Sequence, residues 1–104
     1  MVTAIPTITL NNGVEMPQVG FGVFQVPNQE TTDAVRSALK AGYRSIDTAA
    51  IYGNEEGVGK ALAESGIARD ELFITSKVWI ADMGYEPTME AFEASLERLG
   101  LDYL

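Results

Sequence analysis

Apolar residues recur three or four positions apart in three stretches of the chain, which is the spacing that predicts amphipathic helices. We expect these helices over about 28–41 and 54–65 and from about Pro87 to Leu99, each with one face turned toward a core. Pro87 suits the first turn of the third helix, where its missing N–H group costs nothing. The apolar positions are, in chain order, Ala34, Val35, Ala38 and Leu39; Val58, Ala61 and Leu62; and Met89, Phe92, Leu96 and Leu99.

The residues at the ends of these helices support the prediction. Asn28 and Asn54 are placed to cap the first two helices by accepting a hydrogen bond from an unpaired backbone N–H group. A glycine followed by an apolar residue stands behind each helix, at Gly42-Tyr43, Gly66-Ile67 and Gly100-Leu101. This is the Schellman pattern, so each helix is predicted to stop there and to return the chain toward the core.

Shorter apolar runs between the helices predict strands. Residues 19–24 are typical of a buried strand, 44–47 are short and β-competent, and 72–78 form the clearest strand pattern of the chain. Ahead of them, residues 7–16 predict a β-hairpin around the turn signal Asn11-Asn12-Gly13.

The alternation of strand, loop and helix is typical of βαβ units, which make a parallel sheet covered by helices. Residues 101–104 look like the opening of a fourth strand, and a complete (β/α)8 barrel needs about 250 residues. We therefore expect an α/β fold that is the N-terminal part of a (β/α)8 TIM barrel. This single incomplete barrel segment has an N-terminal β-hairpin cap over 1–18, then βα units 1–3 and the start of strand 4 over 19–104. A self-contained small α/β domain is the alternative.

Composition narrows the choice of partners. The net charge of −8 argues against nucleic acid or an anionic membrane as the main partner. The chain has no cysteine and no histidine, so it can form neither a disulfide framework nor a metal site built on these ligands. No apolar run approaches the length of a membrane span, and residues 1–6 lack a secretory-signal pattern, so we expect a cytoplasmic location.

Polar and aromatic side chains gather where the predicted strands end, which is where parallel α/β barrels carry their chemistry. These positions are 22–24, then Asp47 with Tyr52, then Lys77 with Trp79. A phenol is a poor acid at neutral pH, but a nearby ammonium stabilises the phenolate, and a carboxylate can hold that ammonium in place. Asp47, Tyr52 and Lys77 therefore suggest a proton donor for a carbonyl oxygen. A surface ion pair beside a half-buried tyrosine is the alternative.

A family resemblance is carried by the predicted N-terminal hairpin and by four further segments, 19–24, 42–49, 52–55 and 74–79. With them the whole chain resembles the N-terminal part of an aldo-keto reductase, and it is most similar to the prokaryotic 2,5-diketo-D-gluconate reductase group. The block made of Asp47-Thr48-Ala49 and Tyr52-Gly53-Asn54-Glu55 is highly specific to that family.

The resemblance implies an oxidoreductase that reduces aldehydes and ketones to alcohols by hydride transfer, with NADPH (NADP+) as cofactor. It gives Tyr52 the role of general acid, with Lys77 favouring the phenolate and Asp47 paired with Lys77. The residues that match the family's site are Tyr52, Asp47 and Lys77 for catalysis; Gly22, Val23, Phe24 and Asp47 for the cofactor; and Phe24, Tyr52 and Trp79 for the substrate pocket.

By the same resemblance, the fourth catalytic residue is a histidine on the strand that begins at Leu101, and the main phosphate- and adenine-binding residues belong to the second half of the barrel. We therefore expect the isolated chain to bind NADPH poorly and to turn over little. Its partners would be a small-molecule carbonyl substrate and the remaining half of the barrel. Two other functions stay open, namely a Schiff-base aldolase that uses Lys77 and a nicotinamide-binding regulatory barrel without catalysis.

Overall fold

The computed structural model describes residues 5–104. Residues 1–4, which belong to the predicted hairpin segment and to the stretch without a secretory-signal pattern, lie outside the described residues. The described part of the chain forms, in order, β1 (Thr7–Thr9), β2 (Glu15–Pro17), β3 (Phe21–Gly22), α1 (Asn28–Lys40), β4 (Ser45–Asp47), the 3₁₀ turn η1 (Ala50–Tyr52), α2 (Glu55–Glu64), η2 (Arg69–Glu71), β5 (Phe73–Thr75), η3 (Ile80–Asp82) and α3 (Tyr85–Leu99).

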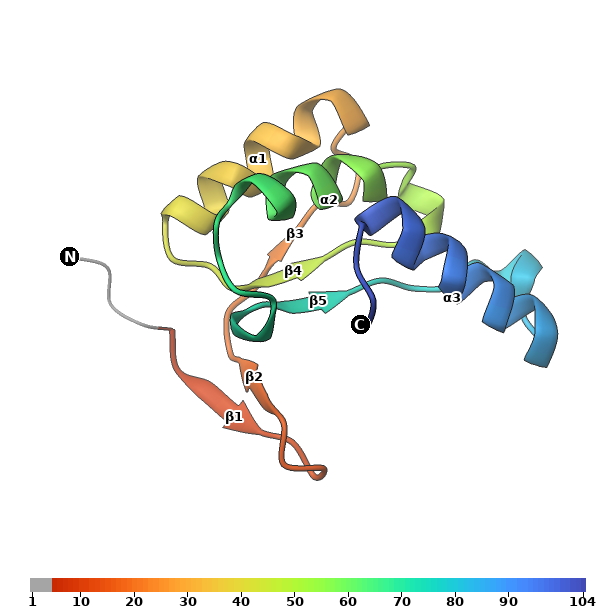
Figure 1. Ribbon diagram of the computed structural model, residues 1–104, viewed down its shortest axis with the longest axis horizontal. Coiled ribbons are helices and arrows are strands. Elements are labelled where there is room, and N and C mark those ends of the chain that lie inside the picture. The colour runs from red at the N-terminus through yellow and green to blue at the C-terminus, as the bar shows by residue number, and fades with distance from the viewer. Residues whose placement is uncertain (1–4) are drawn as a thin grey trace.

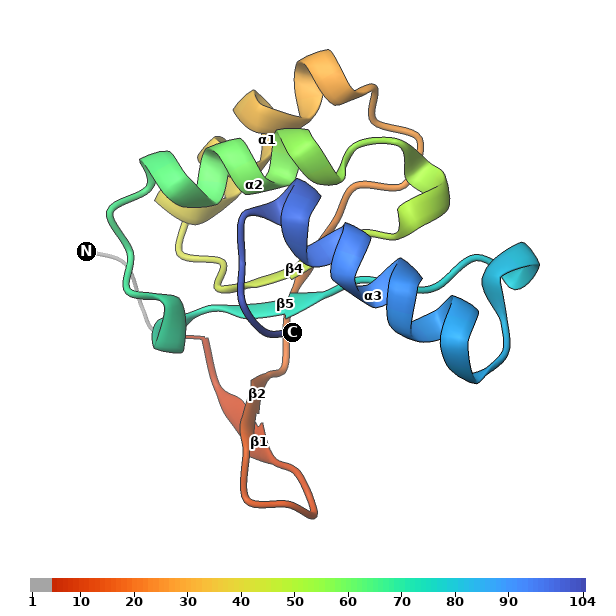
Figure 2. The same ribbon diagram turned by 45° about the vertical axis from the view of Figure 1, so that its right-hand side comes forward.

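The strands make two sheets. β1 and β2 pair antiparallel, which confirms the predicted hairpin. β3, β4 and β5 form a parallel sheet in that order, with Ile46 of β4 between Phe21 and Ile74. In Figures 1 and 2, α1 and α2 lie over one face of this sheet, α3 follows beside α2, and the hairpin stands apart from the helical layer. The predicted parallel βα arrangement is therefore confirmed.

The hydrophobic core lies between the parallel sheet and the helices. It closes because the strands turn apolar side chains toward the apolar faces of α1, α2 and the end of α3. Its buried members are Val23, Val35, Leu39, Ile46, Val58, Ala61, Leu62, Leu72, Ile74 and Leu99.

The helices end at the predicted glycines, and the hydrogen bonds show why. After α1, the Tyr43 N–H group donates to the Ala38 carbonyl at 3.0 Å, and Gly42, with φ of 107°, allows the reversal. α3 ends in the same way at Gly100. After α2, the Ile67 N–H group instead donates to the Ser65 hydroxyl at 3.1 Å, so a side chain completes this end.

Both predicted asparagine caps are corrected by the structure. Asn28 is the first residue of α1 rather than its cap, and its Oδ1 accepts a hydrogen bond from the Gly57 N–H group of α2 at 2.9 Å. Asn54 precedes α2 as predicted, but its side chain makes no capping bond. The reason is tertiary, because the carbonyls that Asn54 binds lie in a distant loop.

Several elements are shorter or more exposed than predicted. The strand predicted over 19–24 is paired only at Phe21–Gly22, with Val23 alone fully buried, and the strand predicted over 72–78 is paired only over Phe73–Thr75. On α3, Met89 and Phe92 are 48% and 38% exposed. Residues 101–104 form no strand in the part of the chain that the structure describes. The strand ends lack a partner strand to pair with among the described residues, and Met89 and Phe92 lack an element packed over them.

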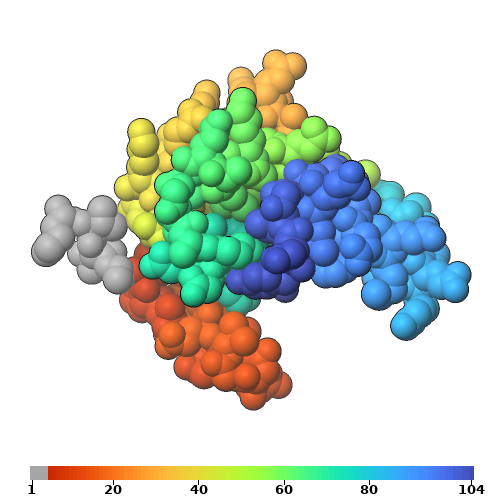
Figure 3. All heavy atoms as spheres, in the orientation of Figure 1, coloured from red at the N-terminus to blue at the C-terminus, as the bar shows by residue number. Residues whose placement is uncertain are grey.

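The molecule is flat, with principal extents of 45 × 36 × 21 Å. Figure 3 shows the hairpin and the η3 end of α3 projecting from the rounded body. Across residues 5–104, no helix is long and apolar enough to cross a membrane.

Candidate active site

Three parallel strands end at one edge of the sheet, and Asp47 lies in the middle of this edge. The register sets Gly22 of β3 and Thr75 of β5 on either side of Asp47. Beyond the strands, the Val23 N–H group donates to the Asp47 carbonyl at 3.2 Å, and the Thr48 N–H group donates to the Thr75 carbonyl at 2.8 Å. The backbone around Asp47 is therefore fixed from both neighbouring strands.

Lys77 lies two residues beyond β5, and its amine reaches back to β4. The Nζ atom donates to the Asp47 carboxylate and, at 3.0 Å, to the Thr48 carbonyl. The Ala50 N–H group donates to the Lys77 carbonyl at 3.1 Å, which fixes the backbone of this residue. The side chains of Lys77 and Asp47 are 48% and 49% exposed, so a ligand can reach the ion pair from solvent.

The turn η1 brings Tyr52 to the same ion pair. It ends at Gly53, whose φ of 71° is a left-handed conformation that glycine adopts without strain. The Tyr52 ring centroid lies 5.2 Å from Lys77 Nζ and 5.2 Å from the centroid of the Phe24 ring. At this distance a cation is attracted to a ring face. The structure therefore brings together Asp47, Lys77, Tyr52 and Phe24, as the sequence predicted.

The surroundings of Lys77 keep its amine charged. Burial lowers the pKa of this amine, whereas the hydrogen bond and the charge of Asp47, followed by those of Tyr52, raise it. The result is a pKa above the ordinary value of 10.5. An ammonium held in this way can stabilise the phenolate that a neighbouring tyrosine leaves when it gives up its proton.

The residues predicted for the cofactor and substrate differ in how they face the site. Gly22 has open space where a side chain would start, and the Phe24 side chain is 65% exposed. Val23 is fully buried in the core. Its N–H group donates to the Asp47 carbonyl and its carbonyl accepts from Asn54, so this predicted cofactor residue does not face the site. Trp79 is 40% exposed and lines a shallow hollow of about 410 Å³ together with Ala50, Ile51, Gly53, Glu55, Glu56, Asp82 and Arg98.

Two consecutive polar residues behind Tyr52 are buried and make tertiary contacts that the sequence analysis did not predict. Asn54 is fully buried and bonds to groups of the β3 and β4 loops. Glu55 is 1% exposed, and its carboxylate accepts hydrogen bonds from Ser76 Oγ at 2.6 Å and from Arg98 Nε at 2.7 Å. Polar residues at the start of a helix are typical of caps, so the sequence pattern alone does not indicate these tertiary contacts.

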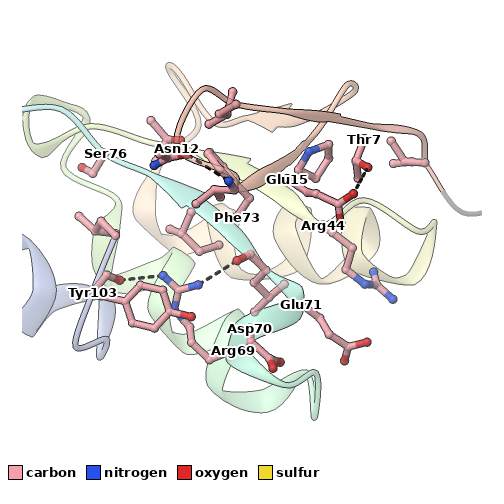
Figure 4. A pocket seen from close by; sticks show the side chains of 18 of the residues that line it. Thr7, Asn12, Glu15, Arg44, Arg69, Asp70, Glu71, Phe73, Ser76 and Tyr103 are labelled. Atoms are coloured by element: carbon pink, nitrogen blue, oxygen red, sulfur yellow. Dashed lines mark hydrogen bonds between the residues drawn. The ribbon is translucent and has the colours of Figure 1, made fainter.

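A hollow of about 940 Å³ lies away from this site. Figure 4 shows Thr7 and Glu15 of the hairpin on one side of it and Arg69 of η2 with Tyr103 on the other. Arg69 donates to the Tyr103 carbonyl at 2.7 Å. Asp47, Tyr52 and Lys77 do not line this hollow, so the candidate site is assigned by the chemistry at the strand ends.

Solved structures show which fold this segment belongs to. An aldo/keto reductase from Brucella melitensis matches with a TM-score of 0.96 and 58% identity, covering 100% of this chain and 40% of that one. The Bombyx mori aldo-keto reductase in complex with NADP matches with a TM-score of 0.92 and 38% identity, covering 99% of this chain and 37% of that one. These neighbours are (β/α)8 barrels, so the chain has the fold of part of such a barrel.

The chain belongs to the aldo/keto reductase family. The model of the Aldo/keto reductase family matches residues 18–104. Glyoxal reductase of Bacillus subtilis (strain 168) is 68% identical over 99 residues, which are 94% of this chain and 36% of that protein. The chain thus spans about 36% of the length of this curated relative. The family predicted from the sequence motifs is confirmed.

Proposed function

We propose that the chain supplies the N-terminal part of an NADPH-dependent reductase that converts aldehydes and ketones to alcohols, with Tyr52 as the proton donor. The observation that carries this proposal is the Lys77 ammonium, which Asp47 holds 5.2 Å from the centroid of the Tyr52 ring. Membership of the aldo/keto reductase family supports oxidoreductase chemistry on carbonyl groups.

Each of the three residues has one task in this proposal. Tyr52 gives its hydroxyl proton to the carbonyl oxygen of the substrate as that oxygen gains negative charge. Lys77 stabilises the phenolate that remains, because its ammonium lies beside the ring. Asp47 keeps the amine of Lys77 charged and directed toward the site.

The edge of the sheet next to Asp47 fits a nicotinamide cofactor. Gly22 leaves space there, and the exposed ring of Phe24 offers a flat apolar surface. These two residues and the side chain of Asp47 would hold the nicotinamide end. When bound, NADPH supplies the hydride for the carbonyl carbon. The Bombyx mori neighbour in complex with NADP supports this choice of cofactor.

Glyoxal is the first substrate to test. The Bacillus subtilis relative is named for this dialdehyde, and the exposed ring of Phe24 beside Tyr52 leaves room for a small aldehyde. Substrates with two neighbouring carbonyl groups are the proposed class.

The structure gives no support to a Schiff-base aldolase. Imine formation needs a neutral amine, which enzymes obtain by lowering the pKa of a lysine. Lys77 has a raised pKa and is bound to Asp47, which is the opposite arrangement. A regulatory barrel without catalysis differs from the proposed reductase in having no turnover with any aldehyde.

The proposal can be tested in a chimeric barrel, in which residues 1–104 are followed by the part of the Bacillus subtilis glyoxal reductase that lies beyond the matched region. We expect this chimera to oxidise NADPH when glyoxal is added. Tyr52→Phe should lower kcat by about 10²-fold to 10⁴-fold, because it removes the general acid.

Tyr85→Phe is the matched control, because Tyr85 is 85% exposed at the start of α3. It should leave kcat unchanged. Equal activity of the Tyr52→Phe variant and the unmodified chimera would contradict the role of Tyr52, and a folded chimera without turnover would favour the regulatory alternative.

A further inference from the structure

Asn54 is a fully buried polar residue to which the proposed chemistry gives no task. Its Oδ1 accepts a hydrogen bond from Thr48 Oγ1 at 2.7 Å, and its Nδ2 donates to the Val23 and Val26 carbonyls at 2.9 and 3.0 Å. Although Asn54 precedes α2, the side chain makes no capping bond, and Asn28 accepts from an N–H group of that helix instead. The three bonds of Asn54 are therefore directed toward the loops at the strand ends.

The two carbonyls that Asn54 binds belong to one tight turn. The Val26 N–H group donates to the Val23 carbonyl at 3.1 Å, so residues 23–26 form a β-turn with Phe24 and Gln25 at its centre. Gln25 has φ of 64°, the only positive φ of a non-glycine residue in the part of the chain that the structure describes. This conformation is strained for a residue with a Cβ atom, and strained residues persist where their surroundings hold them.

The turn decides where Phe24 lies. The Phe24 ring meets the Tyr52 ring with 5.2 Å between centroids, and its side chain is otherwise exposed. On the other side of Asn54, Thr48 directly follows Asp47 and gives its carbonyl to the Lys77 amine. One amide side chain thus connects the loop of Phe24, the segment of Asp47 and its own loop, which carries Tyr52.

We propose that Asn54 is a positioning residue of the reductase site, which holds the strained 23–26 turn so that Phe24 faces Tyr52 beside Asp47. This inference rests on the proposed function, in which Phe24 contacts the nicotinamide and the substrate. Asn54 acts through the turn and touches no reacting atom.

The first test measures the turn itself in the 104-residue chain by NMR. Asn54→Asp keeps the shape of the side chain and an acceptor for Thr48 but removes both N–H donors to the turn. We expect the nuclear Overhauser contact between the rings of Phe24 and Tyr52 to be lost. Adding Gln25→Gly should restore it, because glycine adopts a positive φ without strain.

Asn28→Asp is the matched control, because it makes the same chemical change at an asparagine that contacts α2 rather than the turn. It should leave the ring contact unchanged. A buried carboxylate can prevent folding, so Thr48→Val serves as a second variant: it removes the donor to Asn54 Oδ1 without adding charge. We expect it to weaken the ring contact.

The second test measures turnover in the chimeric barrel. Asn54→Asp should lower kcat/KM for glyoxal by about tenfold to a hundredfold, the loss that a small misplacement of a site residue causes. Asn54→Asp combined with Gln25→Gly should recover most of this loss, which a purely structural role of Asn54 would not predict.

An unchanged ring contact in both Asn54→Asp and Thr48→Val would overturn the inference. So would a loss of equal size in Asn28→Asp, or the absence of any recovery with Gln25→Gly. If the ring contacts change as expected while the unmodified chimera reduces no aldehyde, the proposed function fails and the placement of Phe24 by Asn54 stands.

Discussion

The Lys77 ammonium is bound by the Asp47 carboxylate and the Thr48 carbonyl, while about half of its side chain remains exposed, 48%. A group with a higher pKa in the folded than in the unfolded protein stabilises the fold when it is protonated. The contribution of Lys77 is therefore complete below its ordinary pKa of 10.5 and disappears as the pH rises through the raised value. Solvent screening of the exposed pair keeps this contribution small.

This linkage predicts a pH dependence for Lys77→Met. The difference in the free energy of unfolding between this variant and the wild type should be constant well below the ordinary pKa of 10.5 and should shrink as the pH rises above it. Urea denaturation at a series of pH values measures it, with the exposed Lys60→Met on α2 as control. A difference that stays the same through this range would contradict the raised pKa.

Gly59 allows α2 and α3 to touch through their backbones. A Cβ atom at this position would lie 2.5 Å from the Leu99 carbonyl oxygen and 2.7 Å from its carbonyl carbon. Alanine normally stabilises a helix interior relative to glycine by about 1 kcal/mol. Here the helices must move apart, so we expect Gly59→Ala to destabilise the fold by about 1–3 kcal/mol in urea denaturation. If Gly59→Ala stabilised the fold, Gly59 and the backbone of Leu99 would have to lie farther apart than described here.

The roles of single residues were the hardest to predict from the sequence. Asn54 was placed correctly before α2, yet its partners lie 28 and 31 residues earlier, and nothing local indicates them. Asp47 and Lys77 were predicted together because consecutive parallel strands end at one edge, which is a rule of topology. Proximity of two residues could be predicted where the topology of the fold determines it. The hydrogen-bond partners of a side chain could not be predicted where both local and distant groups are available.

Between elements, one buried carboxylate joins α2 to α3. Glu55 at the start of α2 accepts from Arg98 of α3 and from Ser76, which directly precedes Lys77. The first turn of a helix also favours a negative charge because of the helix dipole. The helices themselves were predicted well, because their apolar spacing and terminal glycines are local signals. The strands were predicted too long, because pairing depends on neighbouring strands.

Two arginine variants compare how much the buried ion pair of Glu55 and an exposed ion pair contribute to the free energy of unfolding. Arg98→Met leaves the buried Glu55 without its cation and should destabilise the fold by about 3 kcal/mol. Arg36→Met removes exposed ion pairs with Asp33 and Glu64 and should cost less than about 1 kcal/mol. Urea denaturation of both variants makes the comparison, and equal losses would show that burial of Glu55 is unimportant.

For the whole molecule, a run of exposed apolar side chains lies along η3 and α3. Along η3 and α3 the exposed apolar side chains include Ile80, Met83 and Met89, at 69%, 65% and 48%. Patches of this kind mark contact surfaces.

We expect the 104-residue chain alone to show little NADPH-dependent reduction of glyoxal. Mixing it with a polypeptide that carries the remaining part of the Bacillus subtilis glyoxal reductase should produce activity, because the second piece covers the open surface. Loss of NADPH absorbance measures turnover, and the same mixture with Tyr52→Phe is the control. Full turnover by the chain alone, free of longer protein, would contradict this expectation.

The order of the parallel strands, β3 then β4 then β5, has a consequence for synthesis on the ribosome. After β3, each strand has its partner already made when it emerges, so the sheet can grow in one direction without waiting for later sequence. Asp47, Tyr52 and Lys77 can meet once Lys77 has left the exit tunnel, whereas Glu55 must wait for Arg98 before its charge is matched. During synthesis the Asp47–Lys77 ion pair can therefore form before the buried Glu55 carboxylate is paired with Arg98.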